Sequence, residues 1–207
     1  MPPFILLASA SPRRHEILDL LAIPHGVLRV PAPEGEDEPQ FPGEAAADYV
    51  RRTARDKALH AVAWLDAGGQ PEAIPADWPA DWRHAPILSA DTTVILDGQV
   101  LGKPRDAADA AATLRRLAGR EHAVHTAVVL AHQHQLHESV SISTVRFQPL
   151  SETQIEAYIA SGEPFGKAGS YAIQGRAAAF VAHLAGSHSG VMGLPAHETT
   201  QLLHLIA

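Results

Sequence analysis

The stretch "SASPRRHEIL" places two adjacent arginines, Arg13 and Arg14, at the start of a predicted helix. Pro12 suits the first helical position and Ser11 suits the capping position before it. Acidic residues usually occupy this turn, because a helix N-terminus carries roughly half a positive charge. If an anion such as phosphate binds there, the free backbone N–H groups and both guanidinium groups attract the same ligand. The alternative is that both arginines are simply solvated.

A predicted hairpin over 86–104, "PILSADTTVILDGQVLGKP", carries two further charged groups. Asp91 directly follows the end of an apolar strand, where a carboxylate can activate water or bind a metal ion. The alternative role for Asp91 is to cap a turn. Lys103 stands between a glycine and a proline at the far end of the hairpin. A lysine held in such a loop suits phosphate contact, although exposed loop lysines are also common.

A glycine-rich segment, "GKAGSYAIQG" at 166–175, combines Lys167 with Gln174. Glycines allow the backbone to approach a ligand closely. The Gln174 amide offers one acceptor and one donor group, which suits the edge of a nucleobase, unless it is an ordinary surface glutamine. Neither the GxGxxG pattern nor the Walker pattern occurs here, so those phosphate-binding motifs are absent.

Other candidate groups carry weaker signals. The acidic run "EGEDE" at 34–38 could bind Mg²⁺ through carboxylate oxygens, or it could be a solvated loop. Lys57, within a predicted helix, is by default an exposed helix residue. Three histidines, at 132, 134 and 137, have the residue type for a metal site, but their segment reads as the tip of a hairpin.

Composition limits the function classes. The 207 residues carry a formal net charge of −7, which argues against a general coat for nucleic acid, and any polyanion must bind at a local basic site. The absence of cysteine excludes disulfides and a thiolate nucleophile. The apolar run at the start is too short to span a bilayer and has no basic residues before it. We therefore expect a cytoplasmic protein that does not act on a membrane.

The elements that position these residues alternate between helix and strand, which predicts an α/β fold with a mixed sheet. Residues 66–85 are rich in proline and glycine and are interpreted as a surface insertion in a single domain spanning 1–207. Ser151 and Gln154 have the spacing of a capping box. Apolar periodicity and turn residues predict strands at 4–9, 25–30 and 177–186, hairpins over 86–104 and 121–150, and helices at 12–22, 44–65, 105–119, 151–162 and from about 195.

Taken together and in this order, the motifs resemble the Maf family of nucleotide pyrophosphatases. The similarity spans nearly the whole chain apart from 66–85. It rests on "LASASPRRHEIL", "DE" at 37–38, "RTARDKA", "SADTTV", "LGKP", "HAVHTAVVL", "GEPFGKAGSYAIQG" and "GVMGLPAHETTQLL".

This resemblance implies a mixed sheet wrapped by helices, with a substrate cleft between two lobes. It also implies hydrolysis of nucleoside triphosphates to monophosphate and pyrophosphate with a divalent cation, Mg²⁺, Mn²⁺ or Co²⁺. The expected partner is a small nucleotide, with a homodimer left open. The residues at the specificity positions resemble the branch that acts on dTTP and UTP.

Individual roles follow from the matched positions. Asp91 corresponds to the proton acceptor, and Glu38 together with Asp91 to the acidic residues near the metal ion. The specificity positions are Arg13, Thr92 and Gln174, and the phosphate-binding positions are Ser9, Arg14, Lys57 and Lys103.

The chain departs from the family pattern at Gly166, where aspartate is usual, and at Gly190, where asparagine is usual. The loss of a carboxylate at Gly166 removes one expected contribution to the metal or water network. The resemblance also implies an alternative, because members of the family are linked to septum formation: a protein that binds nucleotides and regulates cell division without significant turnover. The missing carboxylate at Gly166 fits such a weakened catalyst. Asp91 and Lys103 favour the enzyme.

Overall fold

The computed structural model describes residues 3–31 and 39–206, and it contains one mixed seven-stranded sheet. Six strands follow the order β2-β1-β3-β5-β6-β7, and β4 pairs with β3 beside this path. β1 is parallel to β2 and to β3, whereas all other pairs are antiparallel. The strands are β1 (Ile5–Leu7), β2 (His25–Val27), β3 (Ile87–Leu96), β4 (Gln99–Leu101), β5 (Glu121–His132), β6 (Gln135–Phe147) and β7 (Val181–Ala185).

Helices cover both faces of this sheet. In the described part of the chain they are α1 (Pro12–Leu20), α2 (Ala46–Asp66), α3 (Ala107–Leu117), α4 (Glu152–Ala160), α5 (His188–Met192) and α6 (Ala196–His204), with short 3₁₀ turns η1 (Trp82–His84), η2 (Ala168–Ser170) and η3 (Arg176–Phe180). The α/β class with a mixed sheet is therefore confirmed.

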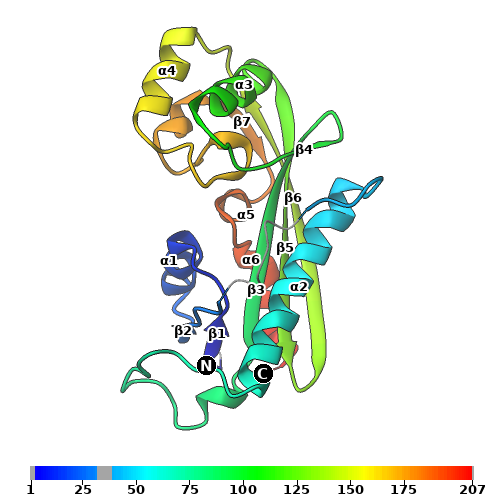
Figure 1. Cartoon of the computed structure of the whole chain (residues 1–207), viewed down its shortest axis with the longest axis vertical. Helices are drawn as coiled ribbons and strands as arrows, with labels where there is room; N and C mark the ends of the chain where they lie inside the picture. Colours follow the sequence, from blue (N-terminus) through cyan, green and yellow to red (C-terminus); the bar gives the residue numbers. More distant parts are fainter. Residues whose placement is uncertain (1–2, 32–38, 207) are drawn as a thin grey trace.

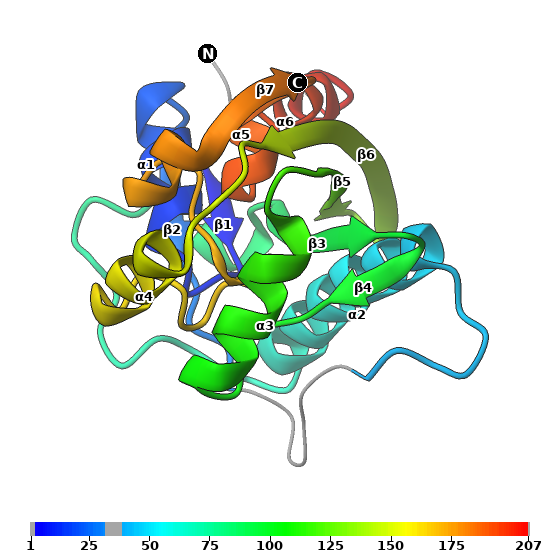
Figure 2. The same ribbon diagram turned by 90° about the horizontal axis from the view of Figure 1, so that it is seen from above.

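Successive side chains of β1 point to opposite faces of the sheet, which explains why helices pack on both faces. Ile5 and Leu7 pack towards α1 and α6, whereas Leu6 packs towards α2 on the opposite face. The buried face of α2 is built from small residues, Ala54 and Ala58 among them, so its backbone lies close to the sheet. Figure 2 shows α2 on one side of the long strands and α6 on the other.

Two lobes extend from the long strands (Figure 1). One lobe contains α1, β1, β2 and α6, and the other contains α3, α4 and the segment from 162 to 180. The second lobe has its own core, in which Phe147 lies edge-on to Tyr171 and Phe180. Strands β3, β5 and β6 run through both lobes and hold them in register.

The two predicted hairpins are confirmed, and their turns have the expected backbone. Asp97 and Gly98 link β3 to β4 with positive φ angles of 53° and 76°. Gln133 and His134 link β5 to β6 with φ angles of 48° and 64°. Two consecutive left-handed residues match the twist of a tight hairpin.

The prediction that Asp91 follows the end of a strand is wrong, because pairing with β5 continues through Asp91 within β3. The middle of β3 nevertheless has one unpaired edge. β1 pairs with β3 only as far as Leu88, and β4 pairs with it only from Val94 onwards. The intervening residues, including Asp91 and Thr92, are paired with β5 on one side alone. Side chains from both faces of the strand can therefore reach the space that opens at this edge.

Some local predictions need correction. The strand predicted over 177–186 begins only at Val181, because the preceding residues form the 3₁₀ turn η3. The short helix α5 was not predicted. Ser11 occupies the N-cap position of α1, but its side chain makes no capping hydrogen bond. The Ser151–Gln154 capping box is present as predicted.

The segment 66–85 is largely exposed, but it is not wholly a surface feature. Trp82 is buried against the α2 side of the sheet. Trp78 lies over Gly26, where an added Cβ atom would clash with the indole ring. The segment contributes no residue to the cavity described below. No helix in the described residues is long and apolar enough to cross a membrane.

Candidate active site

A cavity of about 410 Å³ opens at the unpaired edge of β3, with residues of both lobes on its walls. Its walls come from segments far apart in the sequence: the start of α1, the middle of α2, strand β3, the loop after β4, the loop 166–174 and the end of α5. The charged groups on its walls are Arg13, Arg14, Lys57, Asp91, Lys103 and Lys167.

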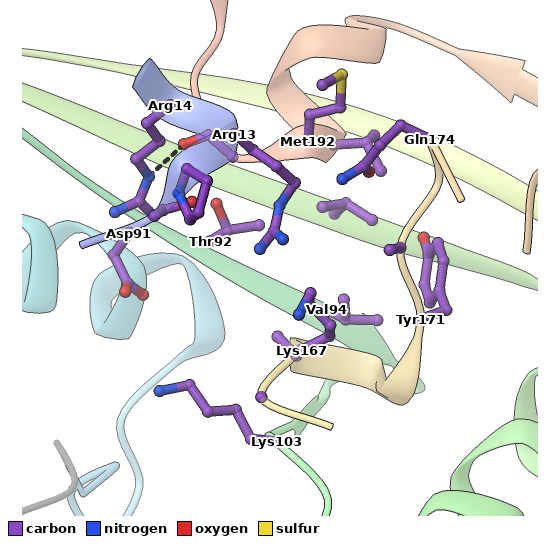
Figure 3. Close-up of a pocket in the computed structure, with 18 of the residues that line it drawn as sticks. Arg13, Arg14, Asp91, Thr92, Val94, Lys103, Lys167, Tyr171, Gln174 and Met192 are labelled. Atoms are coloured by element: carbon purple, nitrogen blue, oxygen red, sulfur yellow. Dashed lines mark hydrogen bonds between the residues drawn. The ribbon is translucent and has the colours of Figure 1, made fainter. Parts of the chain in front are cut away.

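The first turn of α1 places both arginines at the cavity, but in different surroundings. Arg14 donates from Nε to the carbonyl of Gly193, at 2.8 Å, and from Nη1 to Ser9 Oγ, at 3.0 Å. Figure 3 marks the first of these hydrogen bonds with a dashed line. Arg13 is half-buried, and this burial lowers the pKa of its guanidinium, although Glu16 opposes the effect. Placing a desolvated cation at a positive helix end fits an anionic ligand.

Asp91 forms an ion pair with Lys57 from α2. Lys57 Nζ lies 2.5 Å from Asp91 Oδ1, and the Asp91 side chain is only 14% exposed. Helix α2 is fixed against β3 by a hydrogen bond from Ser89 Oγ to the carbonyl of Ala54, at 2.8 Å. The helix–strand contact therefore sets the geometry of the ion pair, and Lys57 is not the exposed residue that its helical position suggested.

Two further lysines come from loops that are joined to each other. The Gly169 N–H donates to the carbonyl of Gly102, at 3.1 Å, and links the Lys103 loop to the Lys167 loop. The pKa of Lys167 is lowered, first by burial and then by the positive charge of Arg13, with Lys103 adding to the effect and Glu163 opposing it. These cations disfavour one another in the empty cavity, so a bound anion relieves their repulsion.

The loop that carries Lys167 and Gln174 is held by specific contacts. Gly169 has φ +68°, and a Cβ atom added there would stand 2.8 Å from the Val94 methyl groups. Tyr171 Oη lies 2.9 Å from Nε2 of the buried His122, and the Ala172 N–H donates to Tyr158 Oη at 3.1 Å. Burial lowers the pKa of His122 to about 4, so the imidazole is neutral near pH 7.

Figure 3 shows Asp91 and Gln174 towards opposite sides of the cavity, with Thr92 and Arg13 between them. Gln174 lies on the same side as Tyr171, Val94 and Met192. The cavity thus has a charged side and a side where one amide projects among apolar and aromatic groups. Such a division suits a ligand with an anionic group at one end and a flat polar ring at the other.

Comparison with known proteins is consistent with this geometry. A family model described as Maf-like protein matches residues 4–206. The chain belongs to the Maf family. A relative from Bordetella pertussis, named dTTP/UTP pyrophosphatase, is 58% identical over 202 residues, which cover 98% of this chain and 92% of the relative.

More distant relatives carry the same name. The protein from Bordetella avium is 55% identical over 201 residues, covering 97% of this chain and 94% of its own. The protein from Burkholderia pseudomallei is 50% identical over 206 residues, covering 97% and 92% respectively. Similarity to the Maf family therefore extends across both lobes and every wall of the cavity.

Most residues singled out from the Maf-like motifs meet in this cavity. Its walls include Arg13, Arg14, Lys57, Asp91, Thr92, Lys103 and Gln174. Ser9 does not line it, and instead accepts hydrogen bonds from Arg14 and from the Ser11 N–H. Glu38 lies outside the described residues. Gly166 lines the cavity with φ +71°, and open space surrounds the position of an added Cβ atom.

Two contributors were not identified from the sequence. The backbone carbonyl of Gly193, which orients Arg14, belongs to the "GVMGLP" motif but offers no side chain as a signal. Gly193 has φ +117°, and a Cβ atom there would stand 3.5 Å from Thr92 Oγ1. Thr126, buried beneath Thr92, looks in the sequence like any polar residue of an alternating strand.

The donor groups fit a divalent cation that binds together with substrate. Among the described residues, Asp91 is the only carboxylate on the cavity wall. Mg²⁺ commonly binds to one or two carboxylates plus substrate phosphates and water, so this donor set is sufficient. Among the described residues, no group of histidines that could bind a metal ion lies at the cavity. The group formed by His15, Asp19 and His25 lies outside its walls.

Proposed function

We propose that this chain hydrolyses nucleoside triphosphates, dTTP and UTP in preference to others, to the monophosphate and pyrophosphate. The observation that supports this most directly is the cavity itself, where five cationic side chains surround one carboxylate. In a chain with net charge −7, this local reversal of sign selects a polyanionic small molecule. The names of the relatives give the reaction and the substrates.

The cations hold the triphosphate. Arg13 and Arg14 bind phosphate oxygens at the start of α1, where the backbone N–H groups add to their attraction. Lys57 and Lys103 reach it from α2 and the loop after β4. Ser9 acts through Arg14, whose guanidinium it helps to orient. Lys167, on the facing loop, adds a further positive charge.

Asp91 takes a proton from the attacking water. The water oxygen forms a bond to the α-phosphorus, and the bond from that phosphorus to the bridging oxygen breaks. The electron pair leaves with pyrophosphate, whose charge the lysines and arginines stabilise. A divalent cation at Asp91 and Glu38 would supply further charge neutralisation of the phosphates.

Gln174 and Thr92 read the base. Uracil and thymine share a 4-oxo acceptor beside an N3–H donor, and cytosine inverts this pair. A glutamine amide can rotate to match either pattern, so Gln174 needs a neighbour of fixed polarity. Thr92 is that neighbour. A site that leaves buried polar groups unpaired can reject an analogue by ~10⁴-fold.

The test is a pyrophosphate-release assay over a panel of triphosphates with Mg²⁺, Mn²⁺ and Co²⁺. We expect dTTP and UTP to have kcat/KM values well above those of CTP and the purine triphosphates. Gln174→Glu should depress turnover of dTTP and UTP, because a carboxylate cannot donate a hydrogen bond. Equal values for UTP and CTP would refute the base-reading model but leave the hydrolytic activity intact.

The alternative, a nucleotide-binding regulator without turnover, is not favoured. The relatives at 50–58% identity are named as pyrophosphatases, and Asp91 lies on the wall of a cavity together with Lys57 and Lys103. Absence of pyrophosphate release with every nucleotide and metal, despite measurable nucleotide binding, is the outcome that would favour it.

A further inference from the structure

A directed chain of hydrogen bonds runs behind Thr92. Thr92 Oγ1 lies 2.9 Å from Thr126 Oγ1, and Thr126 Oγ1 lies 2.7 Å from the carbonyl of Gly190. Thr92 and Thr126 are direct cross-strand partners on β3 and β5. Thr126 is only 1% exposed, so water does not offer it other partners.

The chemistry of the groups fixes the direction of this chain. A backbone carbonyl can only accept, so Thr126 must donate its single hydroxyl hydrogen to Gly190. Thr126 therefore has only lone pairs to offer Thr92, and Thr92 must donate its own hydrogen to Thr126. What Thr92 then presents to the cavity is an oxygen that can accept a hydrogen bond but cannot donate one.

We infer that Thr126 is a positioning residue that makes Thr92 an obligate acceptor towards the substrate. This inference rests on the proposed function. An acceptor-only oxygen repels phosphate oxygens and the unprotonated N3 of cytosine, and it attracts the N3–H of uracil and thymine. Gln174 alone cannot select one hydrogen-bonding pattern, because its amide can rotate. The selection thus depends on Thr126, which does not line the cavity.

Thr126→Val tests this directly, because valine keeps the shape and removes the hydroxyl. The fold should tolerate the change, since the Gly190 carbonyl also accepts from the Gly193 N–H, at 3.0 Å. Without its acceptor, the Thr92 hydroxyl can rotate and donate to cytosine. We expect kcat/KM for CTP to rise by about tenfold or more, while that for UTP stays within about threefold. Thr126→Ser, which keeps the hydroxyl, should retain the original UTP-to-CTP ratio.

Thr126→Ala provides a second variant if valine lowers the melting temperature. An unchanged UTP-to-CTP ratio in folded Thr126→Val or Thr126→Ala would overturn the inference. Failure of the proposed function looks different, because the wild-type protein would then release no pyrophosphate from UTP at all.

A second inference concerns three side chains outside the cavity. His15 and Asp19 occupy positions i and i+4 of α1, and His25 begins β2. One potential ligand atom from each lies within 4.8 Å of the others. His15 Nδ1 and His25 Nε2 are 2.5 Å apart, and His15 Nε2 is 3.4 Å from Asp19 Oδ2.

The backbone prepares His25 as a ligand. Its Nδ1 lies 2.8 Å from the carbonyl of Ile23, which can only accept, so Nδ1 carries the proton. In the neutral imidazole this leaves the lone pair on Nε2, facing His15. Metal-binding histidines characteristically donate their second ring nitrogen to a carbonyl or carboxylate in this way.

We propose that His15, Asp19 and His25 form a second metal site, selective for Zn²⁺ or a similar transition metal. Two imidazoles and a carboxylate suit such ions, whereas Mg²⁺ prefers oxygen ligands. Nitrogen ligands around a tetrahedral Zn²⁺ stand roughly 3.3 Å apart, so the two rings must separate slightly. His15 is half-exposed and Asp19 more so, which leaves room for that movement. The ion would tie α1 to β2.

The experiment measures Zn²⁺ binding by competition with a chromophoric chelator, in excess Mg²⁺ to occupy the catalytic cavity. The wild-type protein should bind one Zn²⁺ more than His15→Gln or His25→Gln. Zn²⁺ should raise the melting temperature of the wild type but not that of these two variants. His197→Gln, an exposed histidine on α6, is the matched control and should behave as wild type. Equal binding and equal melting shifts in all four proteins would show that the histidines form only a hydrogen-bonded pair.

Discussion

The chemical environment of the Asp91 carboxylate is set more by neighbouring side chains than by its position in β3. Its side chain is mostly buried and paired with Lys57, and the other charged groups on the described cavity wall are cations. In the absence of ligand the ion pair partly compensates the carboxylate. In the proposed reaction, the phosphates of a bound triphosphate would compete for Lys57 and leave the Asp91 carboxylate available to accept a proton. The same contact therefore serves the resting protein and the proposed reaction.

Asp91→Asn should retain nucleotide binding and lose hydrolysis. The amide is nearly isosteric but cannot accept the proton of water, and loss of a general base costs ~10²–10⁴-fold in rate. Pyrophosphate release and calorimetric titration with dTTP measure the two properties separately. Asp97→Asn, at the exposed β3–β4 turn, is the control and should keep normal turnover. Near-normal turnover in Asp91→Asn would remove this residue from the mechanism.

The two adjacent arginines should respond differently to replacement by alanine. Arg14→Ala loses hydrogen bonds to Gly193 and Ser9, each worth about 1 kcal/mol, so its melting temperature should fall. Arg13→Ala removes a cation whose pKa burial already lowers, so thermal stability should hold or rise slightly. Both variants should bind dTTP more weakly.

Thermal unfolding and titration calorimetry distinguish these effects. Arg29→Ala changes an exposed arginine outside the cavity and should alter neither property. A sharp loss of stability in Arg13→Ala, with turnover preserved, would show that Arg13 serves the fold and not an anion.

At the scale of elements, the sequence predicted what local chemistry determines. Both hairpins, the capping box of α4 and the first turn of α1 follow from residues within a few positions of each other. Helix α5 has only five residues, too few for a periodic pattern, and Ser187 caps it through the Gly190 N–H. The turn η3 precedes β7 because Phe180 packs into the aromatic core of the second lobe, a contact that the local pattern cannot reveal.

Substitution of Gly169 tests which contacts hold the 166–174 loop in place. Gly169→Ala must adopt φ +68° and also place a methyl group 2.8 Å from Val94. Gly162→Ala, at φ +78° with nothing within 4 Å, shares the backbone cost of about 1–2 kcal/mol without the contact. We expect Gly169→Ala to be the less stable variant and the only one with reduced kcat/KM, because its loop carries Lys167 and Gln174. Equal losses would mean that the Val94 contact does not position the loop.

At the scale of the whole molecule, the site depends on pairings that no single motif contains. The unpaired edge of β3 exists because β1 stops at Leu88 and β4 begins at Val94. The motifs identified most of the residues on the cavity wall. They did not reveal the chain of hydrogen bonds from Thr92 to Thr126 and on to the Gly190 carbonyl. These hydrogen bonds depend on the register of β3 and β5 and on the position of α5, both of which are set by packing over the full sheet.

The free energy of unfolding of the whole protein should depend on pH through the buried side chain of His122. Burial lowers its pKa to about 4 in the folded protein, and its Nδ1 has no hydrogen-bond partner among the described residues. In the unfolded chain the pKa is about 6.5. Between these values the unfolded state binds more protons, so the free energy of unfolding falls as the pH drops from 6.5 to 4. At about 1.36 kcal/mol per pKa unit, the loss approaches the order of 3 kcal/mol.

Urea unfolding at pH 7 and pH 4 measures this contribution. His122→Phe should lose stability at both values, because Tyr171 loses its partner, but the difference between the two should shrink by the amount due to His122. His197→Gln, exposed on α6, controls for the general effect of acid and should keep the wild-type difference. Because His122 holds Tyr171 at the cavity wall, protonation should also loosen the loop that carries Gln174. An unaltered pH dependence in His122→Phe would assign the acid sensitivity to other groups and leave His122 a packing residue only.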